Sequence, residues 1–177
     1  MSDANFDLSP PTAEQRRTLE AALTPEERDV LLNHGTERPF CGVLLNNKNA
    51  GVYCCKLCGL PLFTANQKFE SGTGWPSFTA PFADKHLTMV SDNAFGMRRT
   101  EIRCARCGSH QGHVFDDGPP PTHQRYCINS VSLDFVASGE KLHDKLGRYK
   151  SPKFLRFVDE LPKGPSGKVQ RLKLAKL

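Results

Sequence analysis

The cysteines of this 177-residue chain fall into a pattern that separates four of them from the other three. Cys55-x-x-Cys58 and Cys104-x-x-Cys107 form two matched pairs, and a glycine follows each pair. Four thiolates in two such knuckles are the ligand set of a closed tetrahedral zinc site. A redox dithiol is the alternative for a single CxxC, but the duplication favours zinc. Because four sulfur ligands leave no open coordination position, we expect one structural zinc ion per chain.

Cys127 stands outside that set and has the residues of a reactive thiol around it. Arg125 lies two positions earlier, so on a strand it would share the face of Cys127, stabilise the thiolate and lower its pKa. An isolated cysteine is also often a small buried hydrophobe, so the residues alone leave both readings open. His110 and His113 could be proton donors or acceptors, or surface residues. A ligand role for them is disfavoured because four cysteines already complete the zinc site.

The single tryptophan, Trp75, lies in the glycine-rich run Ser71-Gly72-Thr73-Gly74-Trp75-Pro76-Ser77-Phe78. Such a turn could present an exposed aromatic platform next to a rigid proline. An ordinary core tryptophan behind a turn is the alternative, and this segment alone favours it.

Composition limits the class of protein. The chain is 38% hydrophobic and 24% charged, which is typical of a globular protein, and no stretch approaches the roughly 20 apolar residues that span a bilayer. Residues 1–7 lack the basic and apolar regions of a signal peptide, and free thiols suit a reducing compartment, so we expect a cytoplasmic protein. The formal charge of +5 resides in residues 151–177, and the residues before them are neutral overall. A nucleic-acid-binding body and a membrane partner are therefore not expected.

The predicted elements are two short helices followed by many short strands. Thr12–Gln15 and Thr24–Glu27 read as capping boxes, which predicts helices over Gln15–Leu23 and Arg28–Asn33, with Gly35 as the stop of the second. From Phe40 onward the chain alternates between turn residues and short apolar stretches, the pattern of an antiparallel β domain. The predicted strands are Gly42–Leu45, Gly51–Cys54, Leu60–Phe63, Met97–Cys104, His113–Phe115 and Val131–Val136.

Together these segments resemble the methionine sulfoxide reductase B family from about Asp7 to Val136. The resemblance rests on the two CxxCG knuckles with Tyr53, and on four further runs: Gly35-Thr36-Glu37-Arg38-Pro39-Phe40, Lys68–Phe78, His110-Gln111-Gly112-His113-Val114-Phe115 and Arg125-Tyr126-Cys127-Ile128-Asn129-Ser130. It implies a mainly β fold of two antiparallel sheets in a tent-like arrangement, with the zinc away from the active site. It also implies a substrate, the R epimer of methionine sulfoxide in oxidised proteins.

The resemblance further implies a role for each candidate residue. Cys127 would attack the sulfoxide sulfur and be left as a sulfenic acid. His110 and His113 would donate hydrogen bonds or protons to the sulfoxide oxygen, while Arg125 would hold the thiolate and Asn129 would order the pocket. Trp75, with Phe115 as a second wall, would pack on the methyl group of the substrate.

Regeneration of the thiol departs from the commonest pattern of the family. Many members carry a resolving cysteine between the glycines of the tryptophan loop, where this chain has Thr73. Cys41 is the leading candidate instead, and would form a disulfide with Cys127 for thioredoxin to reduce. Cys54, which neighbours a zinc ligand, and direct reduction by a small thiol are the alternatives.

Residues 139–177 form a basic extension with a second resemblance. Residues 149–152 and 157–171 look like the extreme C-terminus of acyl-adenylate-forming ligases, in which the lysine matching Lys168 contacts the acyl-adenylate. No ATP-binding domain accompanies it, so we expect no ligase activity and interpret the extension as a fusion remnant or as a basic tail of fortuitous similarity. The expected organisation is a helical segment (1–36), a β-rich catalytic and zinc-binding core (37–138) and this extension, in a monomer. A non-enzymatic zinc-binding module and a general thiol–disulfide oxidoreductase are the competing classes.

Overall fold

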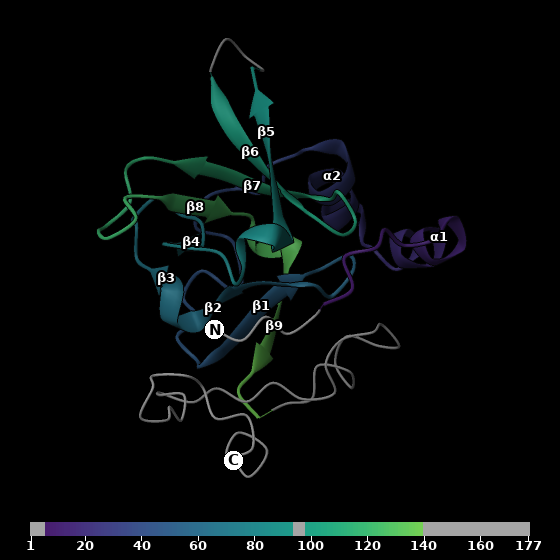
Figure 1. Cartoon of the computed structure of the whole chain (residues 1–177), viewed down its shortest axis with the longest axis horizontal. Coiled ribbons are helices and arrows are strands. Elements are labelled where there is room, and N and C mark those ends of the chain that lie inside the picture. Colours follow the sequence, from purple (N-terminus) through teal and green to yellow (C-terminus); the bar gives the residue numbers. More distant parts are fainter. Residues whose placement is uncertain (1–5, 94–97, 140–177) are drawn as a thin grey trace, which may run out of the picture.

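The computed structural model describes residues 6–93 and 98–139 and shows two antiparallel sheets with two helices at one side (Figure 1). The mainly β fold of two antiparallel sheets is thereby confirmed. The candidate ligase-like segment around Lys168 lies outside the described residues. Within those residues, no helix combines the length and the apolar character needed to cross a membrane.

Both helices begin at the predicted capping boxes. In α1 (Ala13–Ala21) and α2 (Pro25–Asn33), the capping threonine accepts a hydrogen bond from the third helical residue, whose side chain bonds back to the threonine amide. The predicted stop of α2 is off by one residue, because His34 takes the left-handed cap conformation, with φ 60°. Gly35 follows it and donates its amide to the Asp29 carbonyl at 3.1 Å. The helix end thus places an imidazole where the sequence predicted a glycine.

The smaller sheet has the strand order β2-β1-β9, and the larger sheet has the order β3-β4-β8-β7-β6-β5, with antiparallel pairing throughout. Short 3-10 helices at Ala65–Gln67, Asp84–His86 and Ser130–Ser132 join some of these strands. The strands are β1 (Gly51–Cys55), β2 (Pro61–Thr64), β3 (Lys68–Phe69), β4 (Ser77–Phe78), β5 (Leu87–Asp92), β6 (Arg99–Cys104), β7 (His110–Phe115), β8 (Arg125–Ile128) and β9 (Leu133–Ala137).

Four of the predicted strands correspond to β1, β2, β7 and β9, and β6 covers the described part of a fifth. The predicted strand Gly42–Leu45 is wrong, because this segment is a turn in which the Leu45 amide donates to the Gly42 carbonyl at 3.1 Å. The Leu44 amide donates to Ser130 Oγ at 2.8 Å, so side-chain bonding replaces a strand partner there.

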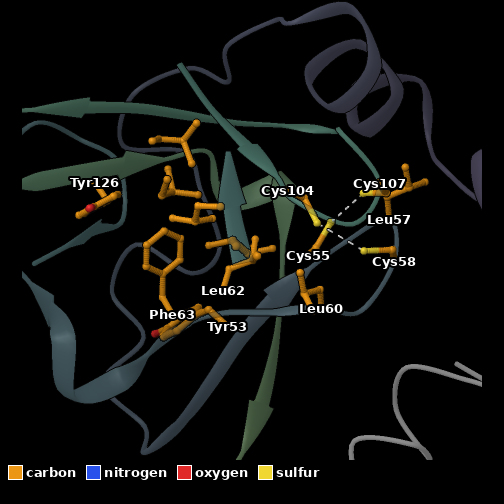
Figure 2. Packing of buried hydrophobic residues seen from close by; sticks show 14 of the residues in the cluster. Tyr53, Cys55, Leu57, Cys58, Leu60, Leu62, Phe63, Cys104, Cys107 and Tyr126 are labelled. Atoms are coloured by element: carbon orange, nitrogen blue, oxygen red, sulfur yellow. Dashed lines mark hydrogen bonds between the residues drawn. The ribbon is translucent and has the colours of Figure 1, made fainter. Parts of the chain in front are cut away.

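An aromatic core lies between the two sheets (Figure 2). Phe63 of β2 stacks on Phe78 of β4 with ring centroids 4.4 Å apart, and Tyr53 of β1 meets the same ring edge-on at 5.0 Å. All three side chains are completely buried. Such pairs contribute about 0.5–1.5 kcal/mol each beyond the burial of their area, so this cluster fastens the short strand β4 against the smaller sheet.

Candidate functional site

The four knuckle cysteines converge on one point, as the sequence predicted. Cys55 Sγ lies 3.6 Å from Cys107 Sγ, and Cys58 Sγ lies 3.5 Å from Cys104 Sγ. The four sulfur atoms are all within 4.8 Å of one another, and all four residues are buried. Figure 2 shows them at one end of the core, with Tyr126 at the other end.

The residues fit a zinc ion. Sulfur atoms on a tetrahedron with Zn–S bonds of about 2.3 Å are separated by roughly 3.8 Å, close to the distances found here. Each glycine after a knuckle has a left-handed φ (73° at Gly59 and 72° at Gly108), and its amide donates at 2.8 Å to the carbonyl of the first cysteine of the pair. The pKa of Cys58 is raised by the neighbouring sulfurs, Cys104 first, and by burial, so a central cation is needed to hold all four as thiolates.

Cys127 lies on β8, in the interior of the larger sheet. It is paired with Ser77 of β4 on one side and with His113 of β7 on the other. Residues directly opposite each other on antiparallel strands place their side chains on the same face, with Cβ atoms about 4.5–5.5 Å apart. His113 is therefore an immediate neighbour of the Cys127 thiol. The Thr73 hydroxyl also approaches the sulfur at 3.9 Å.

The expected lowering of the Cys127 pKa is wrong for the free thiol in this structure. Burial raises the pKa of Cys127, and this outweighs the opposing effects of Thr73 and Arg125. Arg125 is engaged elsewhere, because its Nε and Nη2 donate to the Asp117 carboxylate at 2.8 and 2.9 Å. The guanidinium also lies 4.5 Å from the centroid of the Phe115 ring, so it covers one face of that ring. The thiol therefore has a cation nearby, shared with a carboxylate.

Both histidines of the candidate site are held by carboxylates. His110 Nδ1 lies 2.6 Å from Glu101 Oε1, and His113 Nε2 lies 2.9 Å from Asp92 Oδ2. The two rings are in contact, with centroids 5.5 Å apart. His110 is buried, and among the described residues its Nε2 has no hydrogen-bond partner. His113 can thus exchange protons with the thiol on the neighbouring strand, and His110 contacts His113.

Trp75 is half-buried, and its position depends on a contact to Glu37. The indole Nε1 donates to the Glu37 carbonyl at 3.1 Å, while the Glu37 amide donates to Asn129 Oδ1 at 3.1 Å. Asn129 in turn donates from Nδ2 to the Gln111 carbonyl at 3.1 Å. Gly74 (φ 94°) has no room for a Cβ, which would come within 2.8 Å of Pro39. These contacts tie the tryptophan loop to the end of β8 and to β7.

The two candidate resolving cysteines differ sharply in exposure. Cys41 is exposed, whereas Cys54 is completely buried on β1 in a cluster with Val52 and Val136. The residue before Cys41, Phe40, donates its amide to the Gly74 carbonyl at 2.8 Å, and the adjacent Thr73 contacts Cys127. Cys41 is therefore attached to the loop that borders the Cys127 sulfur.

A large surface groove lies away from the candidate site. It has a volume of about 660 Å³ and runs along the segments 43–47 and 130–135, with neither Cys127 nor either histidine in its lining. A smaller cavity of about 110 Å³ lies beside Trp75 and is lined by Phe40, Lys68 and Phe69 among others. The indole thus borders a hollow on the surface.

Sequence reasoning missed the carboxylates that support the site. Glu101 on β6 holds His110, and Asp92 on β5 holds His113. Asp117, just after β7, holds Arg125. These acidic residues have no distinctive spacing in the sequence. Glu37 lies within a run that carries the family resemblance but received no role. Pairing each histidine with an acidic residue on a neighbouring strand would have found Glu101, since Glu101 pairs with His113.

Together, the fold and the site define a class: a β protein fastened by a four-cysteine metal site, with a separate half-buried cysteine beside two carboxylate-bound histidines. The SelR domain matches residues 23–137. A relative from Caulobacter vibrioides, "Peptide methionine sulfoxide reductase MsrB", is 65% identical over 148 residues, which cover 84% of this chain and 93% of that protein. Relatives of the same name from Xylella fastidiosa (58% over 146 residues; 82% and 94%) and Methanosarcina mazei (56% over 116 residues; 66% and 83%) also match. The chain belongs to the methionine sulfoxide reductase B family.

Proposed function

We propose that this chain reduces the R epimer of methionine sulfoxide in oxidised proteins, with Cys127 as the nucleophile. Reduction of protein-bound methionine sulfoxide follows from the family and from its relatives' names. The observation that carries the role of Cys127 is its place opposite His113, because a proton donor and acceptor then adjoins the one half-buried thiol. In the net step the sulfoxide S–O bond breaks, a new S–O bond forms on Cys127, and the thiol proton ends on the oxygen. Methionine is released and Cys127 becomes a sulfenic acid.

We assign proton transfer to the two histidines and stabilisation of the thiolate to Arg125. His113 and His110 exchange protons with the sulfoxide oxygen, and their carboxylate partners hold the rings in place. Arg125 favours the thiolate of Cys127, opposing the effect of burial. Asn129 orders the pocket indirectly, through its hydrogen bonds to Glu37 and Gln111.

Epimer selection is assigned to the aromatic side of the site. Trp75 is held through Nε1, which leaves its ring to pack on the substrate methyl group while the histidines bind the oxygen. Phe115 is a second wall, limited to the ring face that Arg125 does not cover. An apolar surface on one side and donors on the other distinguish the two configurations at sulfur.

Cys41 is proposed to resolve the sulfenic acid. Its thiol attacks the Cys127 sulfur, water leaves, and the resulting disulfide is reduced by thioredoxin. Exposure supports Cys41 over Cys54, since a partner protein must reach the disulfide and Cys54 is completely buried on β1. Cys41 must approach the sulfur, and the contacts of Phe40 and Thr73 bring its segment to the same loop.

The remaining assignments concern the whole chain. The zinc ion is structural, since its four cysteines are buried and leave no open position. All seven cysteines lie in the described residues and none of them forms a disulfide there, which supports a reducing compartment such as the cytoplasm. We divide the chain into a helical segment (1–36), a catalytic core (37–138) and an extension (139–177) without ligase activity; the SelR match ends at residue 137, in line with that division. We expect the protein to work as a monomer.

The test uses a peptide carrying either the R or the S epimer of methionine sulfoxide, with dithiothreitol as reductant. We expect turnover of the R epimer alone, and its loss in Cys127→Ser. With thioredoxin as reductant, Cys41→Ser should complete one turnover and then stop, while the control Cys54→Ala should continue to cycle. Turnover by Cys127→Ser would exclude this nucleophile, and full cycling by Cys41→Ser would exclude that resolving role. A zinc-loaded protein inactive on both epimers would favour the binding-module reading.

A further inference from the structure

One buried carboxylate, Glu101 on β6, binds two imidazoles and a guanidinium at once. Its Oε1 lies 2.6 Å from His110 Nδ1 and 2.7 Å from His34 Nδ1, and its Oε2 accepts from Arg103 Nη2 at 2.6 Å. Glu101 and His110 are 5% and 2% exposed, while the His34 side chain is 47% exposed. The left-handed cap at the end of α2 brings His34 into this position.

The contacts determine which ring nitrogen carries the proton. Burial alone would raise the pKa of Glu101, but the hydrogen bonds from Arg103, His110 and His34 outweigh it and lower this pKa to about 2. An ionised carboxylate can only accept hydrogen bonds, so both imidazoles must donate to it from Nδ1. In neutral His110 the other nitrogen, Nε2, then carries a lone pair.

Neutral His110 is the form expected near pH 7. Burial lowers the pKa of His110, and the positive fields of His113 and His34 add to that effect, although Glu101 opposes it. Its Nε2 is buried and, among the described residues, without a hydrogen-bond partner. The ring contacts His113, which pairs with Cys127. The acceptor atom Nε2 of His110 therefore belongs to a ring that contacts His113, and His113 is the neighbour of the Cys127 thiol.

A second metal site is the competing interpretation of the same residues. One nitrogen from each histidine and one oxygen of Glu101 lie within 4.8 Å of one another, and two histidines with a carboxylate can bind a transition metal. The Arg103 guanidinium on the other oxygen of Glu101 argues against this, since it already neutralises the carboxylate and would repel a cation. Hydrogen bonding is the better account.

We propose that Glu101 is a positioning residue of the reductase, which holds His110 with its proton on Nδ1 so that Nε2 is the acceptor in a relay of the Cys127 thiol proton through the adjacent His113 ring to the sulfoxide oxygen. This role rests on the proposed function. The proton leaves the Cys127 sulfur, passes over the two imidazole rings and ends on the oxygen that is transferred to Cys127, so the step needs no further reductant. It also explains how a thiol whose burial disfavours ionisation can act as a nucleophile.

The test compares Glu101→Gln with the unaltered enzyme on the R-epimer peptide with dithiothreitol. Loss of the negative charge should lower kcat by about 100-fold, within the range of general acid–base catalysis, and leave KM close to its original value. The pKa of His110 should fall, because the carboxylate that raises it is removed. The acid limb of the kcat/KM profile should therefore move to lower pH. Glu14→Gln, on the exposed side of α1, is the matched control and should change none of these quantities.

Nitrogen-15 NMR of the histidine rings provides a readout that does not depend on activity. In the unaltered protein His110 should be protonated on Nδ1 at neutral pH, and Glu101→Gln should introduce the form protonated on Nε2. An Nε2-protonated His110 in the unaltered protein, or an unchanged kcat in Glu101→Gln, would overturn the proposal. A second bound zinc ion that disappears in this variant would overturn it in favour of the metal site. If the unaltered enzyme itself lacks reductase activity, the proposed function fails instead.

Discussion

Reactivity at Cys127 is a balance between burial and a few polar neighbours. The sequence predicted one influence, a nearby arginine, and the structure adds two others. Burial disfavours the thiolate, and the Thr73 hydroxyl at 3.9 Å favours it. Arg125 contributes less than a free guanidinium would, because Asp117 binds it through two hydrogen bonds. The Thr73 side chain thus supports the thiolate, although a hydroxyl cannot form a disulfide with it.

Thr73→Val should therefore raise the pKa of Cys127 further, because valine keeps the shape and removes the hydroxyl. The pH dependence of iodoacetamide alkylation measures this, in a Cys41→Ser background where the exposed thiol cannot react. We expect the midpoint to move to higher pH, because the hydrogen bond from Thr73 that lowers the pKa of Cys127 is lost. Thr88→Val on β5, where the threonine is exposed, should leave the midpoint unchanged. A midpoint that stays or falls in Thr73→Val would contradict the assigned contact.

At the scale of elements, the segment between α2 and the Cys41 turn connects the site to the strands. Glu37 is 5% exposed, and its carboxylate accepts the Ser130 amide at 2.5 Å and the Val131 amide at 3.0 Å. Its main chain binds Trp75 and Asn129. One residue thus joins the tryptophan loop to the end of β8.

Glu37→Ala should destabilise the protein and displace the tryptophan loop. Two backbone amides lose their acceptor, and an unsatisfied buried donor costs about 1–3 kcal/mol, so we expect the free energy of unfolding to fall by about 2–4 kcal/mol. Urea denaturation measures this loss, and the emission of the single tryptophan reports the loop directly. Glu70→Ala is the control, since Glu70 forms only an exposed pair with Lys48 at 3.3 Å and should change stability by less than about 1 kcal/mol. Equal stability of the two variants would remove Glu37 from this role.

The same scale separates what the sequence could predict from what it could not. Capping boxes and the CxxCG spacing act over a few residues, so the helix starts and the convergence of the four knuckle cysteines were predicted correctly. The two-residue strand β4 is defined by its pairing with β3 and β8, and no local pattern shows this. The register that puts His113 opposite Cys127 spans a connection of nine residues between β7 and β8. Candidate residues could therefore be named, but their supporting carboxylates could not.

For the whole molecule, the four-cysteine site is the second connection between the sheets, after the aromatic core. Cys55 ends β1 of the smaller sheet, and Cys104 ends β6 of the larger sheet. Their partners Cys58 and Cys107 lie in the knuckle turns that follow. A metal at this point therefore joins two strands that belong to different sheets.

Removal of zinc should unfold or greatly loosen the protein. Binding of a structural zinc ion is folding free energy, so its loss should reduce stability by at least about 5 kcal/mol. Thermal unfolding before and after treatment with a strong chelator measures the change, and zinc re-addition under reducing conditions should restore the original transition. Cys104→Ser should reproduce the loss, whereas Cys54→Ala should bind one zinc ion normally. A chelated protein that keeps its transition temperature would show that the ion is dispensable for folding.

The smaller sheet also affects the order in which the chain can fold during synthesis. Its central strand β1 pairs with β9, so Gly51 lies opposite Ala137, and the sheet cannot be completed until almost the whole core has left the ribosome. Both cysteine knuckles emerge earlier, since the second ends at Cys107. Metal binding can therefore precede completion of the sheet. In a nascent chain whose knuckles already share a metal ion, β1 is held close to the position that β9 will take.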